Sequence, residues 1–426
     1  MPDCQVLGKA IEPSPISADS LSSVRAKAES RCKSNLLTDT VGILFAGRTK
    51  ERQEPDLSIT MSFSVVAAGD VVLSGPLHRP TNEVYDHLRG ADSSFVNLEM
   101  PFTKSNSPNE KLIPLKCEPA HARTLQEIGV DVVTLANNHG MDYGIEGLRE
   151  TLQTLKDTGI AHVGGGQNIA ESFSPVIKRF NGTNVAYIGV TTTLPNGSGA
   201  GPARSGLAGV RVFTKYVIDS VTLDESPGMA PFVETMTYKP DEEILLQTIS
   251  DAKAQADIVL VAIHWGVPYG WVASTQDEIA TYQQPLAHAM IDAGASAIFG
   301  HHPHVVQGVE FYRGVPVFYS LGNLIFSNNI VTPVAGWRTY PAYCWTSLQS
   351  SFSNIGALAK VVWNDGKLSS CILTPIMITE DGEPAEATTE TVKVLLLRLR
   401  ALSQGRGTGF ELRQAEKGYA VDITQA

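Results

Sequence analysis

The chain has 426 residues, of which 43% are apolar and 18% are charged, so it can bury a large core and is not a disordered protein. Lys and Arg number 33 against 44 Asp and Glu, and the formal net charge of -11 argues against binding to nucleic acid or to an anionic membrane. Five cysteines lie far apart without a CxxC pair, which excludes a disulfide framework or a zinc knuckle.

Targeting signals are not expected. The N-terminus has an acid at Asp3 and lacks the apolar segment of a secretory signal. The longest uncharged apolar stretch, at 258–267, is about half of the ~20 residues that a membrane-spanning helix needs. We therefore expect a cytoplasmic protein. Residues 1–60 are rich in Ser, Pro, Lys and Glu, which predicts a loosely ordered extension.

From residue 62 onward, short apolar runs alternate with helical patterns. Strands are predicted at 63–68, 95–98, 132–135, 185–190, 258–263, 297–299 and 315–319. Helices are predicted at 142–156, from Pro119 onward, and from Ile279 to Gly294 with a kink at Pro285. Strands too apolar to alternate, with helices between them, indicate sheets covered on both faces.

The rest of the chain shows two further patterns. Residues 196–240 and 328–353 are predicted to be long loops, which are candidates for covering a substrate. Beyond residue 357 we expect strands at 357–363 and 371–378, a helix at 388–402, and a small hairpin that pairs 410–413 with 419–423.

Polar side chains with ligating atoms follow five of the predicted strands. They are Asp70, Glu99, Asn138 with His139, His264, and the pair His302 and His304 around Pro303; Asp142 lies three residues after His139. Each of these alone is more often a cap, a turn residue or a core histidine. In open α/β sheets, however, ligands bind beyond the carboxyl ends of the strands, so their convergence on one edge favours a metal site.

The mixture of ligands indicates a two-metal cofactor. A bridging carboxylate can hold two divalent ions about 3.5–4 Å apart, where they share a hydroxide. Imidazole and carboxylate ligands together suit Mn, Fe or Zn better than Ca or Mg alone. A histidine beside the site that does not coordinate can protonate the leaving group.

Six segments resemble those of the CapA family, the poly-γ-glutamate capsule biosynthesis proteins, whose fold is similar to that of calcineurin-like metallophosphoesterases. They read GDVVLSG (69–75), VNLEMPFT (96–103), LANNHGMDYGIEGL (135–148), HWG (264–266), GHHPHVVQGVE (300–310) and GVPVFYSLGNLIF (314–326). The resemblance implies an α/β fold, a four-layer α/β/β/α sandwich of the metallophosphoesterase type with mixed sheets. We expect an N-terminal extension at 1–60, a CapA-like domain at 61–382, and a C-terminal helix and small hairpin at 383–426 packed on it.

The resemblance also implies roles for the strand-end residues. Asp70 resembles the first aspartate ligand, and Glu99 takes the place of the bridging carboxylate. By the same resemblance, His304 also binds the first metal, and the second metal is bound by Asn138, His264 and His302. His139 is then the general acid. Asp142 is predicted as a further catalytic residue. Two departures stand out. Val72 occupies the place of a phosphoesterase histidine ligand, and Pro268 precedes Tyr269 where many relatives have a glutamate.

Substrate binding is predicted for Asn323, Tyr269, Arg204 and Arg211. An arginine fork pairs with a carboxylate at two points, although a solvated loop charge is the commoner role for any one arginine. The leading function is a dinuclear metal-dependent hydrolase of the CapA type acting on a γ-glutamyl or similar carboxylate-rich amide in polymer or small-metabolite biosynthesis, with a synthetase as partner. The alternatives are a phosphomonoesterase or phosphodiesterase, and a non-catalytic accessory protein of poly-γ-glutamate synthesis.

Overall fold

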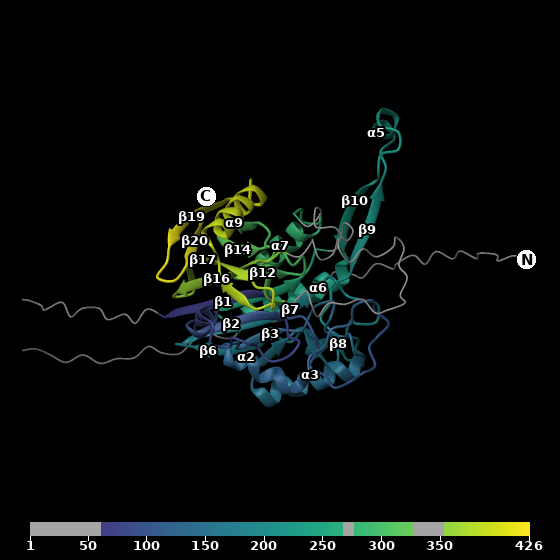
Figure 1. Ribbon diagram of the computed structural model, residues 1–426. Helices are drawn as coiled ribbons and strands as arrows, with labels where there is room; N and C mark the ends of the chain where they lie inside the picture. The colour runs from purple at the N-terminus through teal and green to yellow at the C-terminus, as the bar shows by residue number, and fades with distance from the viewer. Residues whose placement is uncertain (1–60, 267–276, 327–352) are drawn as a thin grey trace, which may run out of the picture. The chain divides into compact units, whose positions relative to one another are not determined.

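Two large β-sheets form the centre of the computed structural model, which describes residues 61–266, 277–326 and 353–426 (Figure 1). The first sheet contains β1 (Ser62–Val72), β2 (Ser93–Leu98), β3 (Val132–Thr134), β4 (Ala161–Val163), β15 (Asn323–Phe326), β16 (Ile355–Asn364), β17 (Lys367–Ile378), β18 (Pro384–Glu386), β19 (Thr408–Gln414) and β20 (Tyr419–Gln425). Among the described residues its order is β19-β20-β17-β16-β1-β2-β3-β4, with β15 beside β1 and β18 beside β17. The strands from β1 to β4 are parallel, whereas β16, β17, β20 and β19 pair antiparallel.

The second sheet is smaller and also mixed. It contains β6 (Val176–Phe180), β7 (Thr183–Thr191), β11 (Ile258–His264), β12 (Ala297–His301), β13 (Val309–Tyr312) and β14 (Val315–Phe318). In the described part of the chain its order is β13-β14-β12-β11-β7-β6. The central strands β7, β11, β12 and β14 are parallel, so their carboxyl ends lie at one edge.

The helices of the described residues are α1 (Asp86–Arg89), α2 (Arg123–Glu127), α3 (Gly144–Thr158), α4 (Ile169–Phe173), α5 (Ser220–Glu225), α6 (Lys239–Lys253), α7 (Gln283–Asp292) and α9 (Thr389–Leu402), with short 3-10 helices η1 (Glu83–Tyr85) and η2 (Pro119–Ala122). Of these, α3 covers the outer face of the first sheet, and α6 and α7 cover that of the second. In contrast, α5 buries no residue, and α9 packs beside β17 and β19. Leu148 and Leu155 of α3 pack on the outer face of the first sheet. Leu245 and Ile249 of α6 are buried and pack on the second sheet together with residues of α7.

A third apolar cluster fills the space between the sheets. Phe63 and Phe95 of the first sheet meet Tyr187, Leu260 and Phe299 of the second. The layers are therefore helices, sheet, sheet and helices, and the predicted four-layer α/β/β/α class with mixed sheets is confirmed. Among the described residues, no helix is long and apolar enough to cross a membrane.

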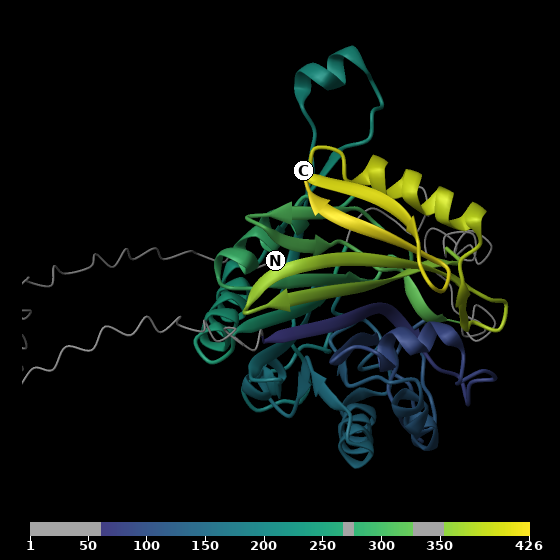
Figure 2. The ribbon, with the colours of Figure 1, turned by 90° about the vertical axis from the view of Figure 1, so that its left-hand side faces the viewer.

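The C-terminal strands extend the first sheet. Ile372 and Leu373 of β17 pair with Asp422 and Val421 of β20, and β19 follows at the sheet edge. Figure 2 shows this hairpin beside α9. The helix and hairpin predicted in this region are both present, and the hairpin continues the ladder of the sheet.

Two predictions about individual elements are wrong. The predicted loop at 196–240 contains a hairpin of β9 (Val212–Val217) and β10 (Phe232–Thr237), with α5 between them. It also contains the short strand β8 (Gly206–Leu207), which pairs with β5 (Gly165–Gly166) outside the loop. The predicted kink at Pro285 is absent because α7 begins only at Gln283, which places the proline in the first turn, where it removes no helical hydrogen bond. The second predicted loop, at 328–353, lies almost wholly outside the described residues.

Candidate metal centre

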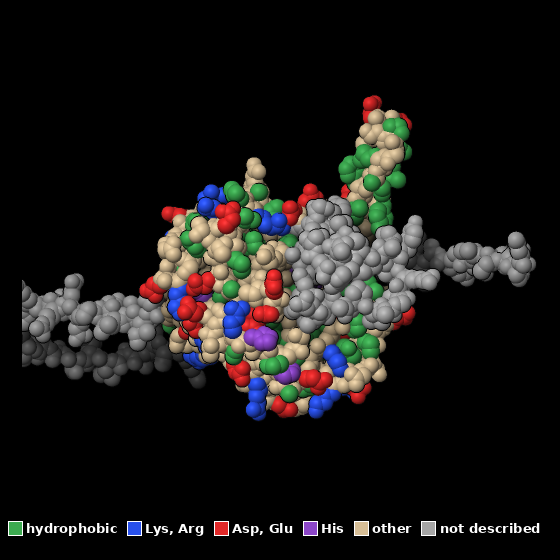
Figure 3. Space-filling view, viewed as in Figure 1, with side chains coloured by type: hydrophobic (Ala, Val, Ile, Leu, Met, Phe, Trp, Pro, Cys, Tyr) green, Lys and Arg blue, Asp and Glu red, His purple; other side chains and the backbone are tan. Residues whose placement is uncertain are grey.

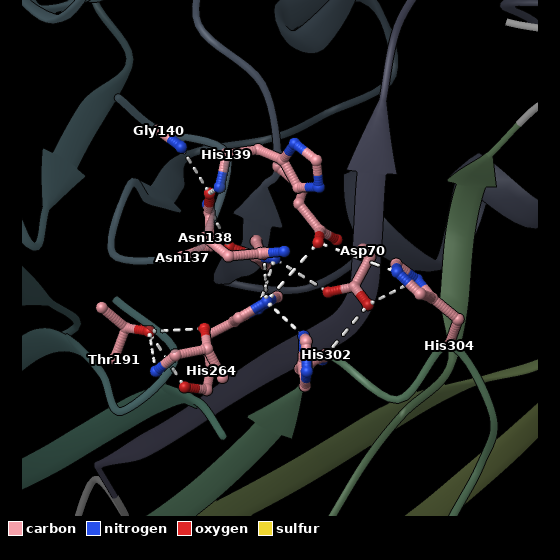
Figure 4. Close-up of polar contacts among 12 residues, drawn as sticks. Asp70, Asn137, Asn138, His139, Gly140, Thr191, His264, His302 and His304 are labelled. Carbon is pink, nitrogen blue, oxygen red and sulfur yellow. Dashed lines mark hydrogen bonds and ion pairs between the residues drawn. The ribbon is translucent and has the colours of Figure 1, made fainter. Parts of the chain in front are cut away.

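The polar residues predicted at strand ends come together in one buried cluster, which Figure 4 shows. Asp70 lies near the end of β1, and Glu99 directly follows β2. Asn138 and His139 lie in the turn after β3. His264 is the last residue of β11, and His302 and His304 follow β12. The cluster therefore draws on both sheets, at the edge where their parallel strands end.

A close approach of two backbones positions Asp70. The amide of Asp70 donates to the carbonyl of Gly322 at 3.0 Å. A Cβ on Gly69 would lie 2.0 Å from the same carbonyl oxygen, so only glycine permits this approach. The pairing of β1 with β15 also shifts register between Asp70 and Val71, and such irregularities re-aim side chains at strand ends.

The ligating side chains form two groups that share Glu99. One group is Asp70, Glu99 and His304, and the other is Glu99, His264 and His302. Within each group one possible ligand atom per residue lies within 4.8 Å of the others. Two ions placed in these groups would have the carboxylate of Glu99 between them, which is the arrangement of a bridged two-metal site.

His264 is the centre of the second group. Its Nε2 lies 2.9 Å from Oδ1 of Asn138, 3.1 Å from Nδ1 of His302 and 3.4 Å from Oε1 of Glu99. The neighbouring strand β7 holds its backbone, since the hydroxyl of Thr191 donates to the carbonyl of His264 at 3.1 Å. These atoms converge on one point, and the amide side chain of Asn138 lies beside this group as a further possible ligand.

His304 is held against the first group from several sides. Its Nδ1 lies 2.9 Å from Oδ1 of Asn323 and 3.2 Å from Oδ2 of Asp70. Its Nε2 lies 3.8 Å from Oε1 of Glu99, and the ring packs on Phe326 with centroids 4.7 Å apart. Asn323 therefore holds the ring of His304 in place, as a hydrogen-bond partner behind a metal-bound histidine would.

The backbone around Pro303 is strained. His302 has φ 106° and His304 has φ 54°, in a region that residues with a side chain seldom adopt. Such strain persists only where the surroundings enforce it, and it is concentrated at functional sites. Here the strained segment turns the imidazole of His304 toward Asp70 and that of His302 toward His264, as Figure 4 shows.

Glu99 provides the test of whether these residues suit a metal. The side chain is fully buried, and neither carboxylate oxygen has a hydrogen-bond partner among the described residues. Burial, together with the charge of Asp70, raises the pKa of Glu99 well above its usual value. Burial of a carboxylate without hydrogen-bond partners costs free energy unless a cation neutralises its charge. The donor set therefore fits divalent metal ions.

The histidines differ in protonation. Burial and the neighbouring His302 hold the pKa of His264 well below its ordinary value, and burial with His304 lowers the pKa of His302 to about 3. Burial alone would lower the pKa of His304, but Glu99 and Asp70 outweigh it and raise that pKa to about 9. At neutral pH two imidazoles thus offer lone pairs, whereas His304 would release a proton on binding a metal.

A network of buried amides lies behind the ligands, and the sequence analysis missed it. Nδ2 of Asn97 donates to Oδ1 of Asp70 at 2.8 Å and lies 3.1 Å from Nδ1 of His264. Nδ2 of Asn137 donates to Oδ1 of Asn97 at 2.9 Å, while Oδ1 of Asn137 accepts from the amides of His139 and Gly140. The available signal was a polar residue inside the apolar strand 95–98.

The proposed acid His139 lies next to the metal-binding residues with a carboxylate and an ammonium as partners. Its Nδ1 lies 2.7 Å from Oδ2 of Asp142 and 2.9 Å from Nζ of Lys111. Nζ of Lys111 also donates to Oδ1 of Asp142 at 2.6 Å. The structure thus brings His139 and Asp142 together as predicted catalytic residues, and it adds Lys111, which no sequence motif had indicated.

Comparison with known proteins identifies the family. The sequence profile of the bacterial capsule synthesis protein family PGA_cap matches residues 64–328, more than half of the chain. The chain belongs to this family. The matched range contains every residue of the candidate metal centre.

Relatives of this PGA_cap chain include two Bacillus proteins. The capsule biosynthesis protein CapA of Bacillus anthracis is 30% identical, in a match that covers 65% of this chain and 61% of the relative. The PGA biosynthesis protein CapA of Bacillus subtilis (strain 168) is 31% identical, covering 67% of this chain and 69% of the relative. The chain thus spans less than two thirds of the Bacillus anthracis protein. A novel phosphatase from Mycoplasma pneumoniae is a solved structure with 14% identity and a TM-score of 0.40, covering 79% of this chain and 98% of the other.

Within this PGA_cap chain, the predicted substrate-binding residues occupy different places. Asn323 contacts His304 at the metal centre. Tyr269 lies outside the described residues. Arg204 donates to the carbonyls of Gly197 and Gly199. Arg211 pairs with Asp241 through Nε at 2.7 Å and Nη2 at 2.8 Å, so both arginines have structural partners away from the cluster, and their binding of substrate stays a prediction.

Val72 occupies the position at which phosphoesterases have a histidine ligand, and its surroundings are apolar. Val72 is buried at the end of β1, with 2% of its surface exposed, and it belongs to the core outside the first sheet. The first group of this PGA_cap chain therefore has Asp70, Glu99 and His304 as ligating side chains, and nothing from the position of Val72 can complete it.

Proposed function

We propose that this chain is a dinuclear metal-dependent hydrolase that acts on a γ-glutamyl or similar carboxylate-rich amide in poly-γ-glutamate synthesis. The observation that carries this proposal is Glu99, a buried carboxylate without hydrogen-bond partners among the described residues that lies between two groups of ligating side chains. Membership of the capsule synthesis family supports the place of this activity in the metabolism of the polymer.

In the proposed reaction, some residues would bind the metal ions and others would transfer a proton. Asp70, Glu99 and His304 would hold the first ion, and Glu99, Asn138, His264 and His302 the second. When bound, two divalent ions supply a hydroxide nucleophile and polarise the carbonyl group of the substrate. His139 protonates the departing amine, and its pairing with Asp142 keeps the ring oriented for that transfer.

The test is hydrolysis by protein loaded separately with Mn²⁺, Zn²⁺ or Fe²⁺. Substrates are γ-glutamyl amides and short poly-γ-glutamate, compared with p-nitrophenyl phosphate and bis(p-nitrophenyl) phosphate. We expect amide hydrolysis that needs metal and falls about 10²- to 10⁴-fold in His139→Ala while metal content is kept. Turnover of the phosphate esters alone would replace the proposed substrate class with a phosphoesterase.

A non-catalytic role has one observation in its favour. Two Mycobacterium tuberculosis relatives, 26% identical over 55% of this chain, are named probable polyglutamine synthesis accessory proteins. An accessory protein would associate with a synthetase and needs no metal. Protein that takes up no Mn²⁺ or Zn²⁺ and hydrolyses none of the substrates would favour this role over the hydrolase.

A further inference from the structure

Residues 102–117 form a closed loop against the turn that bears His139. The two ends of the loop are fastened together, because the amide of Thr103 donates to the carbonyl of Cys117 at 2.9 Å and that of Cys117 to Pro101 at 3.0 Å. The middle of the loop is hydrogen-bonded to the turn. Asn109 donates from its amide to the carbonyl of Asp142 at 2.7 Å and from Nδ2 to that of Met141 at 2.7 Å.

Lys111 is the side chain by which this loop reaches the proposed acid. Its Nζ lies 2.6 Å from the carbonyl oxygen of Asn138, 2.9 Å from Nδ1 of His139 and 2.6 Å from Oδ1 of Asp142. Nδ1 of His139 has either a proton or a lone pair, so it cannot bond to both Asp142 and Lys111, and in the protonated acid it donates to Asp142. Lys111 then donates to the carbonyl of Asn138 and to Oδ1 of Asp142, and with 22% of its side chain exposed it is bound to the turn by these two bonds.

Each contact of Lys111 fixes a different part of the acid. The bond to Asn138 fixes the backbone between a metal ligand and His139. The bond to Asp142 holds the carboxylate, whose other oxygen accepts the amide of Leu115 at 2.7 Å. Because Lys111 holds Asp142 beside Nδ1, the ring of His139 cannot turn over without losing its bond to that carboxylate. Its Nε2 is then the nitrogen that remains available to a leaving group.

We propose that Lys111 is the positioning residue of His139: it locks the ring and its turn so that Nε2 faces the leaving group. This inference rests on the proposed hydrolase function. The simpler role is an ion pair that only neutralises Asp142. The two roles differ in whether the effect of Lys111 passes through His139.

A double-mutant cycle separates these roles. Lys111→Met keeps an unbranched side chain of nearly the same length and removes the ammonium. Lys104→Met is the matched control, since Lys104 lies exposed in the same loop. We expect Lys111→Met to lower kcat about 10- to 100-fold with little change in KM, while Lys104→Met leaves it unchanged. In the His139→Ala background, Lys111→Met should lower kcat no further. An equal loss in both backgrounds would overturn the proposal.

A second measurement needs no activity. In metal-free protein labelled with ¹⁵N-histidine, the ring signals of His139 are identified by their absence in His139→Ala. We expect Lys111→Met, but not Lys104→Met, to move these signals toward values of a ring that exchanges between tautomers. Unmoved signals would overturn the positioning role. Moved signals in a protein without amidase activity would uphold the positioning and refute only the proposed function.

Discussion

At the scale of single residues, Glu99 decides whether two ions can share the site. It belongs to both ligand groups and is the buried carboxylate without hydrogen-bond partners in the described residues. We predict that Glu99→Gln lowers the binding affinity for both ions at least about 100-fold. Loss of a residue that only hydrogen-bonds to a metal ligand already lowers metal affinity about 10- to 100-fold. Asp70→Asn should weaken one ion only. Metal analysis after dialysis measures both, with Glu110→Gln, an exposed position, as control. Two tightly bound ions in Glu99→Gln would refute the bridging role.

His304 gives the metal centre a dependence on pH. The pKa of about 9 means that the ring is protonated at pH 7, whereas a metal needs its lone pair. Binding of the first ion should therefore release about one proton from His304 at pH 7, besides any proton that the raised pKa of Glu99 retains, and its affinity should rise by at least about tenfold per pH unit between pH 7 and 9. Calorimetry in buffers of different ionisation enthalpy counts the protons. Affinity that does not change between pH 7 and 9 would contradict this assignment.

The residues of the candidate metal centre could be found by sequence reasoning because each lies within a few residues of the end of an apolar run. Position relative to a strand end is a local feature, and the topology of parallel strands converts it into proximity. Asn97 and Lys111 were missed for different reasons. Asn97 lies inside a buried strand, where the pattern indicates core. Lys111 lies in a loop without periodicity, and its partners are 27 to 31 residues away.

At the scale of elements, the β9–β10 hairpin stands apart from the sandwich. Phe213, Tyr216 and Phe232 expose 51%, 68% and 53% of their surfaces, and Figure 3 shows apolar side chains along this projecting arm. Its base is narrow, since the amide of Tyr238 donates to the carbonyl of Arg211 at 2.8 Å. The β-branched and aromatic residues of 212–217 were the signal that the loop prediction overlooked.

We predict that the arm can be removed without loss of the metal centre. Replacing residues 212–237 by two glycines would delete three hydrogen bonds between Thr235 and Thr281 and one from Thr237 to Glu242, at a cost of about 2–6 kcal/mol in the free energy of unfolding. Denaturant unfolding and metal analysis measure the outcome. We expect one cooperative transition and unchanged metal binding. Loss of the bound metal would show that the arm supports the site.

At the scale of the whole molecule, the metal centre joins the two sheets. Asp70, Glu99 and Asn138 lie at or after the ends of strands of the first sheet, whereas His264, His302 and His304 lie at or after the ends of strands of the second. The fold class was predictable because family motifs and apolar strands extend over most of the sandwich. The pairing of the C-terminal hairpin with the first sheet was not predictable, because local sequence patterns do not indicate which distant segments pair as strands.

The most direct measurement of the central claim is a crystal structure of protein loaded with Mn²⁺, with anomalous scattering recorded to locate the ions. The two-metal account predicts two peaks about 3.5–4 Å apart with the Glu99 carboxylate between them. One peak should contact Asp70 and His304, and the other Asn138, His264 and His302. A map with a single peak, with no peak, or with ions bound away from Glu99 would contradict the account.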